Sequence, residues 1–189
     1  MKITSETFCP LPFCHINIKS NGKVSLCWRS AKKIGDYSTS SLIEIWNNNN
    51  IKAVRKKLLT GEIPIECKSC LDFEKSNINS TRNQVIQSKK YIAFNDVIKN
   101  IKEDFSLKTD NITIMELRFS SLCNLMCKHC GPLYSSRWKD AAIKNTKLQK
   151  ILCTKIPNNT KDNEISIKNI EEICKFRNIK EFMIAGVNH

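Results

Sequence analysis

Apolar and polar residues alternate over two short stretches near the N-terminus, and the pattern predicts a β-hairpin over residues 13–28. One stretch is His15-Ile16-Asn17-Ile18 and the other is Val24-Ser25-Leu26. Asn21-Gly22 stands between them and is a strong signal for a tight turn. A hairpin brings its two ends together, so residues that flank it become neighbours in space.

Helical spacing follows the hairpin. Ser41 stands three residues before Glu44, the spacing of a capping box, and predicts a short helix that carries Leu42, Ile45 and Trp46. Asn50 is the expected cap of a second helix, whose apolar face carries Ile51, Val54 and Leu58. Gly61 and Pro64 are expected to end that helix.

The second half of the chain has the order strand, helix, strand. Residues 112–119 have the composition of a buried strand, and a helix is predicted from Ser135 or Ser136 towards Leu152. A further helix is predicted up to Phe176, followed by a strand over residues 179–185. This order favours a parallel α/β arrangement.

Composition divides the chain into three predicted units: 1–75, a connector with partial helical spacing over 76–110, and 111–189. No apolar run is long enough to span a bilayer. No apolar signal core follows Lys2, so we expect a cytosolic protein without a membrane partner.

The chain is strongly basic, with 31 Lys and Arg against 18 Asp and Glu, a formal net charge of +13. Nucleic-acid binding is one interpretation of such a charge. The basic residues are nearly all lysines, scattered among many Asn and Ile residues, so a coding bias and a solvated surface explain the charge better. We therefore expect no nucleic-acid partner, and keep a basic zinc module that binds nucleic acid as a third hypothesis.

Ten cysteines in a chain without a signal peptide indicate metal binding. Cys123, Cys127 and Cys130 have C-x3-C-x2-C spacing, so three thiolates within eight residues can surround one [4Fe–4S] cluster and leave one iron open for chemistry. Zinc is an alternative, with His129 close by, but adjacent His129 and Cys130 chelate a single ion awkwardly. Inert buried cysteines are the other alternative.

The stretch from Met115 to Lys139, which includes Cys-Asn-Leu-Met-Cys-Lys-His-Cys-Gly-Pro, resembles the radical SAM superfamily. The resemblance implies that the three cysteines bind three irons and that S-adenosylmethionine chelates the fourth. An electron from the cluster then yields a 5′-deoxyadenosyl radical. His129 occupies the position that lies near the adenine. Ser135-Ser136-Arg137-Trp138 narrows the resemblance to members that also carry a SPASM or twitch module.

The N-terminal unit resembles such a module, through Cys9-Pro10-Leu11-Pro12-Phe13-Cys14, the hairpin, Leu42–Asn47 with Val54-Arg55, and Cys67-Lys68-Ser69-Cys70. The resemblance implies an auxiliary [4Fe–4S] cluster held by Cys9, Cys27, Cys67 and Cys70. The hairpin brings Cys9 near Cys27, which agrees with this set, and zinc is the competing metal. The other cysteines are expected to be buried rather than ligands, namely Cys14, Cys153 and Cys174.

The expected fold is α/β: a small α+β module, then the first β/α units of a partial TIM-type barrel. Gly186 matches one glycine of the cofactor-binding Gly-Gly-Glu-Pro motif, and the glutamate is missing. The sequence is therefore expected to hold only the front of a barrel and to be inactive alone. The resemblance also implies a peptide or protein substrate and an electron donor such as flavodoxin or ferredoxin. A non-catalytic electron-transfer or scaffold protein is the alternative function.

Overall fold

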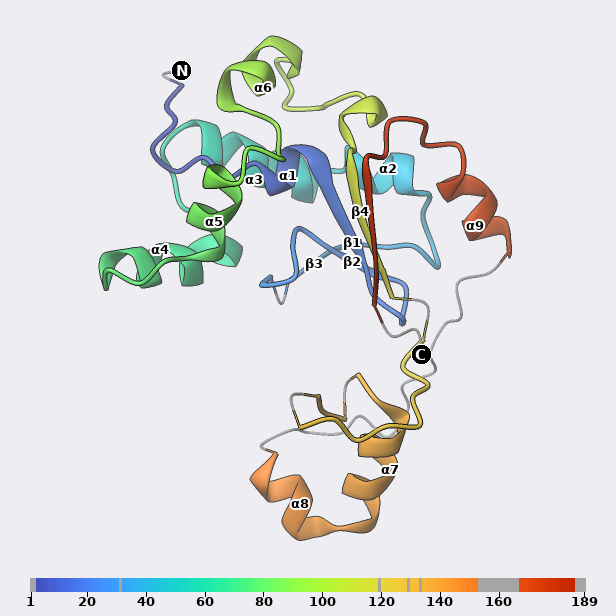
Figure 1. Ribbon diagram of the computed structural model, residues 1–189. Coiled ribbons are helices and arrows are strands. Elements are labelled where there is room, and N and C mark those ends of the chain that lie inside the picture. The colour runs from blue at the N-terminus through green and yellow to red at the C-terminus, as the bar shows by residue number, and fades with distance from the viewer. Residues whose placement is uncertain are drawn as a thin grey trace.

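The computed structural model describes residues 3–30, 32–118, 120–128, 130–132, 134–152 and 167–185, without the side chains of 167–169 and 185. A five-stranded sheet with the order β3-β2-β1-β4-β5 forms the centre of the molecule (Figure 1). Its strands are β1 (His15–Ile18), β2 (Lys23–Ser25), β3 (Lys33–Asp36), β4 (Ile114–Arg118) and β5 (Glu181–Ala185).

The predicted hairpin is confirmed. Strands β1 and β2 pair antiparallel, with Asn17 opposite Ser25. Gly22 in the connecting turn has a φ of +74°, a left-handed conformation that glycine adopts without the steric penalty of a Cβ atom. Strand β3 then pairs antiparallel with β2, with an irregularity between Val24 and Ser25. A short helix, α1 (Leu11–Cys14), leads into β1.

The capping box is also confirmed, at the start of α2 (Leu42–Trp46). The Ser41 hydroxyl accepts a hydrogen bond from the Glu44 N–H at 3.2 Å, and the Glu44 carboxylate accepts one from the Ser41 N–H at 2.8 Å. Two backbone donors that the helix itself cannot use are thereby satisfied.

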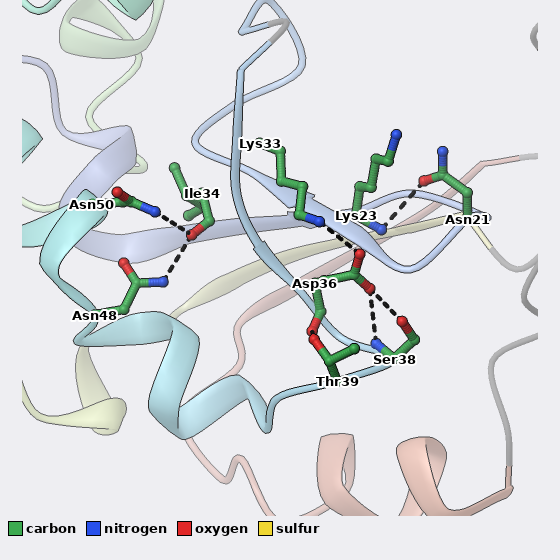
Figure 2. Close-up of polar contacts among 9 residues, drawn as sticks. All are labelled: Asn21, Lys23, Lys33, Ile34, Asp36, Ser38, Thr39, Asn48 and Asn50. Atoms are coloured by element: carbon green, nitrogen blue, oxygen red, sulfur yellow. Dashed lines mark hydrogen bonds and ion pairs between the residues drawn. The ribbon is translucent and has the colours of Figure 1, made fainter.

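The predicted cap of the second helix is wrong by two residues. Helix α3 runs over Asn49–Leu59, and the side chain of Asn48 accepts from the Ile51 N–H at 3.1 Å. Asn50 lies inside the first turn instead. The amide groups of Asn48 and Asn50 donate to the Ile34 carbonyl of β3, at 2.7 and 3.4 Å (Figure 2). Asn48 thus both caps the helix and fixes it to the sheet.

The turn after β3 is closed by the carboxylate of Asp36. It accepts from the Lys33 ammonium at 2.7 Å and from the Ser38 N–H at 3.1 Å (Figure 2). The contact with Lys33, followed by that with the Ser38 hydroxyl, lowers the pKa of Asp36 to about 2. These bonds turn the chain from the last strand of the meander into α2.

The connector is partly helical, as its spacing predicts. It follows the 3₁₀ turn η1 (Ile65–Cys67) and α4 (Lys68–Lys75), and it contains α5 (Thr81–Gln87), α6 (Phe94–Asn100) and the start of the 3₁₀ turn η2 (Thr109–Asn111). Val85 and Val97 belong to the same buried core as the hairpin and α3. Arg55 of α3 is buried and donates to the carbonyls of Pro12 and Phe105, at 2.9 and 3.3 Å. The connector therefore packs onto the N-terminal unit.

The second half keeps the predicted order, with one break. Strands β4 and β5 are parallel, as expected, and α9 (Ile167–Ile173) precedes β5. The helix predicted towards Leu152 is instead two helices, α7 (Ser136–Lys144) and α8 (Thr146–Ile151). Asn145 divides them because its side chain accepts from the N–H groups of Lys147 and Leu148, both at 3.1 Å, and so starts a new helix.

The parallel pairing of β1 with β4 is not predicted by the sequence patterns. Strand β1 of the hairpin lies parallel to β4, with His15 opposite Ile114 and Asn17 opposite Glu116. The hairpin and the later β/α unit therefore share one mixed sheet. The α/β class is confirmed in this form, whereas the partial barrel and the three-unit division stay predictions.

Figure 1 shows α7 and α8 below the sheet, whereas the connector helices and α9 lie beside or above it. Cys14 is buried, as expected. The expectation that Cys174 is buried is wrong: it is exposed in the turn just after α9, whose last residue, Ile173, packs into the core instead. Cys153 lies outside the described residues. Among the helices of the described residues, none is both long and apolar enough to cross a membrane.

Candidate metal centre

Four cysteines from three separate segments of the sequence line one cavity. Cys9 precedes α1, Cys27 follows β2, Cys67 ends η1 and Cys70 lies in α4. The cavity has a volume of about 30 Å³, and its lining also includes apolar atoms of Leu11, Pro12 and Leu26 and polar residues both of the N-terminal unit and of the connector. The structure thus brings together all four cysteines of the predicted auxiliary set.

Local hydrogen bonds fix the segments that carry these thiols. The Cys27 carbonyl accepts from the Ser25 hydroxyl at 3.3 Å and from the Ser30 N–H at 3.2 Å, which turns the chain back after the hairpin. The Cys67 N–H donates to the Pro64 carbonyl at 2.9 Å in the turn that begins η1. Cys9 itself is part of the buried core.

Burial raises the pKa values of three of these thiols. The pKa of Cys9 lies well above its ordinary value, and the pKa of Cys27 is raised in the same way. Burial, followed by the neighbouring Cys27, raises the pKa of Cys67 to about 12. Without a metal these thiols are therefore protonated at neutral pH, and metal binding must displace their protons.

One cation of the connector faces the cavity. Arg82 lines it, and this positive charge acts to lower the pKa of Cys67. The guanidinium donates to the Phe8 carbonyl at 2.8 Å, to the Glu6 carbonyl at 2.5 Å and to the Glu74 carboxylate. No sequence pattern distinguished Arg82 from the other basic residues, because its place beside the cavity depends on how the connector packs.

The donor set suits a soft metal or an iron–sulfur cluster. Within the described ranges, no three Cys, His, Asp or Glu side chains lie close enough together to hold one metal ion as they stand. The cavity has room for about one or two water molecules, less than a four-iron cluster occupies. Binding of either a single ion or a cluster would therefore require these side chains to rearrange.

The three-cysteine loop lies apart from this cavity, between β4 and α7 (Figure 1). Cys123, Cys127 and Cys130 are each half-buried. The Cys130 N–H donates to the Cys127 carbonyl at 3.0 Å, so the last two cysteines share a tight turn. The predicted cofactor contacts His129 and Gly186 lie outside the described residues.

A buried pair on the sheet was not anticipated. Ring atom Nδ1 of His15 donates to the Leu26 carbonyl at 3.2 Å, and Nε2 lies 3.8 Å from Oε2 of Glu116. Neither Nε2 nor Oε2 has a hydrogen-bond partner within the described part of the chain. Burial lowers the pKa of His15 to about 4. No sequence pattern signals this pair, because it depends on the parallel β1–β4 pairing.

Residues 9–71, about a third of the chain, match the family model of SPASM, described as an iron–sulfur cluster-binding domain. The matched range includes all four cysteines of the cavity. None of the curated proteins and none of the solved structures compared with the chain matches it. The match supports the interpretation of the N-terminal unit as an auxiliary iron–sulfur module.

Proposed function

We propose that this protein binds an auxiliary [4Fe–4S] cluster through Cys9, Cys27, Cys67 and Cys70. One observation carries the proposal: four thiols from three separate segments line the same cavity, within the range that matches an iron–sulfur cluster-binding domain. Four thiolates complete the coordination of a four-iron cluster and suit a structural or electron-transfer role.

We further propose that Cys123, Cys127 and Cys130 hold a second [4Fe–4S] cluster and that the protein carries out radical SAM chemistry, with a twitch- or SPASM-type module in front of the core. When bound, such a cluster and S-adenosylmethionine supply a 5′-deoxyadenosyl radical. The loop would hold three irons, and His129 and Gly186 would contact the cofactor. A peptide substrate and a flavodoxin or ferredoxin donor belong to the same proposal.

The test is anaerobic reconstitution of the whole chain with iron and sulfide, followed by quantification of iron, sulfide and zinc. We expect about eight irons in the wild type, since each cluster contains four. Replacing Cys9, Cys27, Cys67 and Cys70 by serine should leave about four, and replacing Cys123, Cys127 and Cys130 should also leave about four.

Two cysteines provide matched controls. Cys14→Ser changes a buried thiol that does not line the cavity, and Cys174→Ser changes an exposed one, so both should keep the full iron content. Zinc in place of iron in the variant that lacks the loop cysteines would make the N-terminal site a zinc site. A wild type without iron would refute both cluster proposals.

The S-adenosylmethionine part needs its own measurement. The cofactor should change the electron paramagnetic resonance spectrum of the reduced loop cluster in the variant that lacks the four cavity cysteines. An unchanged spectrum would favour a non-catalytic electron-transfer protein over a radical SAM protein.

A further inference from the structure

The first turn of α7 is hydrogen-bonded to the backbone of the cysteine loop. The side chains of Ser135, Ser136 and Trp138, together with the backbone N–H of Ser136, form hydrogen bonds with every second residue of the preceding segment. The contacted residues are Ser121, Cys123, Leu125 and Cys127. This segment has no regular secondary structure of its own, so its carbonyl groups depend on partners from elsewhere.

Ser136 holds the first cysteine from both sides. Its hydroxyl accepts from the Cys123 N–H at 3.0 Å and lies 3.2 Å from the Cys123 carbonyl, to which it can donate. The backbone N–H of Ser136 donates to the Ser121 carbonyl at 2.8 Å. One residue therefore fixes the chain on both sides of the Cys123 side chain.

Trp138 holds the other two cysteines. Its indole N–H donates to the Cys127 carbonyl at 3.0 Å. The same carbonyl accepts from the Cys130 N–H, also at 3.0 Å. The indole thus bonds to the group that closes the turn between the second and third cysteines.

These contacts are not needed to begin the helix. Ser135 already caps α7, because its hydroxyl accepts from the Trp138 N–H at 3.3 Å while it donates to the Leu125 carbonyl at 3.0 Å. Within the described residues, the Ser136 hydroxyl and the Trp138 indole make their hydrogen bonds to the loop. Their geometry serves the loop rather than the helix.

We propose that Ser136 and Trp138 are positioning residues that hold the backbone of Cys123 and Cys127 ready for a metal centre. The expected effect on a bound cluster rests on the proposed function of this loop. The positioning itself is a property of the metal-free chain. A loop fixed before binding loses less conformational freedom when it binds, so its metal centre forms more readily and is released more slowly.

The experiment compares Trp138→Phe and Ser136→Ala with wild type in the reconstituted whole chain. Phenylalanine keeps an aromatic ring and removes the indole N–H. Each variant should release the iron of the loop to a chelator roughly two- to tenfold faster, the factor expected for losing a single neutral hydrogen bond. The spectrum of the reduced loop cluster should change, whereas release from the four-cysteine site should not.

Two further variants separate positioning from a general loss of structure. Trp46→Phe removes an indole N–H that donates to the Lys108 carbonyl at 3.2 Å, far from the loop in sequence, and should leave the loop cluster unchanged. Ser136→Thr keeps a hydroxyl and should restore slow release. Equal release from wild type, Trp138→Phe and Ser136→Ala would overturn the inference, as would a change of the same size in Trp46→Phe.

Hydrogen exchange of the metal-free protein tests the positioning role of Ser136 and Trp138 independently of whether the loop binds a cluster. The Cys123 amide should exchange roughly two- to tenfold faster in Ser136→Ala, and the Cys130 amide likewise in Trp138→Phe, because each loses a hydrogen bond in its local network. Unchanged exchange would overturn the positioning role. A loop that binds no iron but shows these changes would refute the cluster proposal and keep the inference.

Discussion

The cysteines of the N-terminal cavity and those of the loop differ in how the chain assembles them. Cys9, Cys27 and the pair Cys67 and Cys70 come from three segments that meet through the core, the hairpin and the packing of α4 and α5. The three loop cysteines lie within eight consecutive residues and are held by the adjacent turn of α7. The first set therefore depends on the global fold, whereas the second depends on local contacts.

The largest expected effect of this difference concerns metal-linked stability. A metal centre in the four-cysteine cavity connects segments that separate on unfolding, so loading should raise the free energy of unfolding. The increase in the free energy of unfolding is about 4 kcal/mol when the free concentration of the bound metal species is a thousand times its dissociation constant. Urea unfolding of loaded and metal-free protein under anaerobic conditions measures it.

Cysteine variants show where that stabilisation arises. Cys67→Ser together with Cys70→Ser should abolish it. The variant with serine at Cys123, Cys127 and Cys130 should retain nearly all of it. An equal loss in both would mean that the loop is as strongly coupled to the sheet as the cavity is.

The next largest effect is the pH dependence of the free energy of unfolding, which arises from His15 in the sheet. The folded pKa of His15, about 4, is below its unfolded value, so the unfolded chain binds more protons between pH 6.5 and 4. The contribution of His15 is fully present above pH 6.5 and is lost as the pH falls towards 4, by about 3 kcal/mol in total. Unfolding of the metal-free, reduced protein across this range measures it.

His15→Gln should flatten this part of the pH profile, since glutamine does not titrate. Glu116→Gln keeps the imidazole and should keep most of the slope. A profile that His15→Gln leaves unchanged would show that folding does not shift the pKa of His15. Hydrogen exchange of the α7 and α8 amides should be measured over the same pH range. These helices form a local region, so their exchange should not change when the sheet core loses stability.

The smallest expected effect compares one helix cap from each region. Ser41→Ala should lower the free energy of global unfolding by about 1 kcal/mol, since α2 packs on the core. Asn145→Ala should instead accelerate hydrogen exchange in α8 and leave global unfolding unchanged. Ser40→Ala, one residue outside the α2 cap, is the matched control for the first change. A global loss in Asn145→Ala would contradict the division into two regions.

Local rules predicted most of the elements near the hairpin. The turn at Asn21-Gly22, the Ser41 capping box and the strand over 112–119 each depend on a few neighbouring residues, and the structure contains all three. The cap of α3 was displaced because both Asn48 and Asn50 have suitable side chains. Only Asn48 reaches the N–H three residues ahead while its amide meets the Ile34 carbonyl of β3.

Long-range placement was predicted less completely. The four cavity cysteines were grouped by the resemblance to a SPASM or twitch module, and the structure places all four along one cavity, whereas their role as metal ligands stays a prediction. The parallel β1–β4 pairing, and with it the buried contact of His15 and Glu116, joins residues about a hundred positions apart. No local sequence pattern predicts a pairing between strands so far apart in the chain. The helical break at Asn145 was missed for a different reason, since an asparagine can either continue a helix or start the next one.

The pairing of β1 with β4 also sets an order of events during synthesis. At 5–20 residues per second, about a hundred residues separate the two strands by roughly 5–20 s on the ribosome. Until β4 emerges, the nascent hairpin has an open edge, and Cys9 and Cys27 lie beside an incomplete core. Contacts so distant in sequence also slow folding, because a long segment of chain must close first. The segments that line the cavity, all within residues 9–82, are therefore made well before β4 pairs with the hairpin.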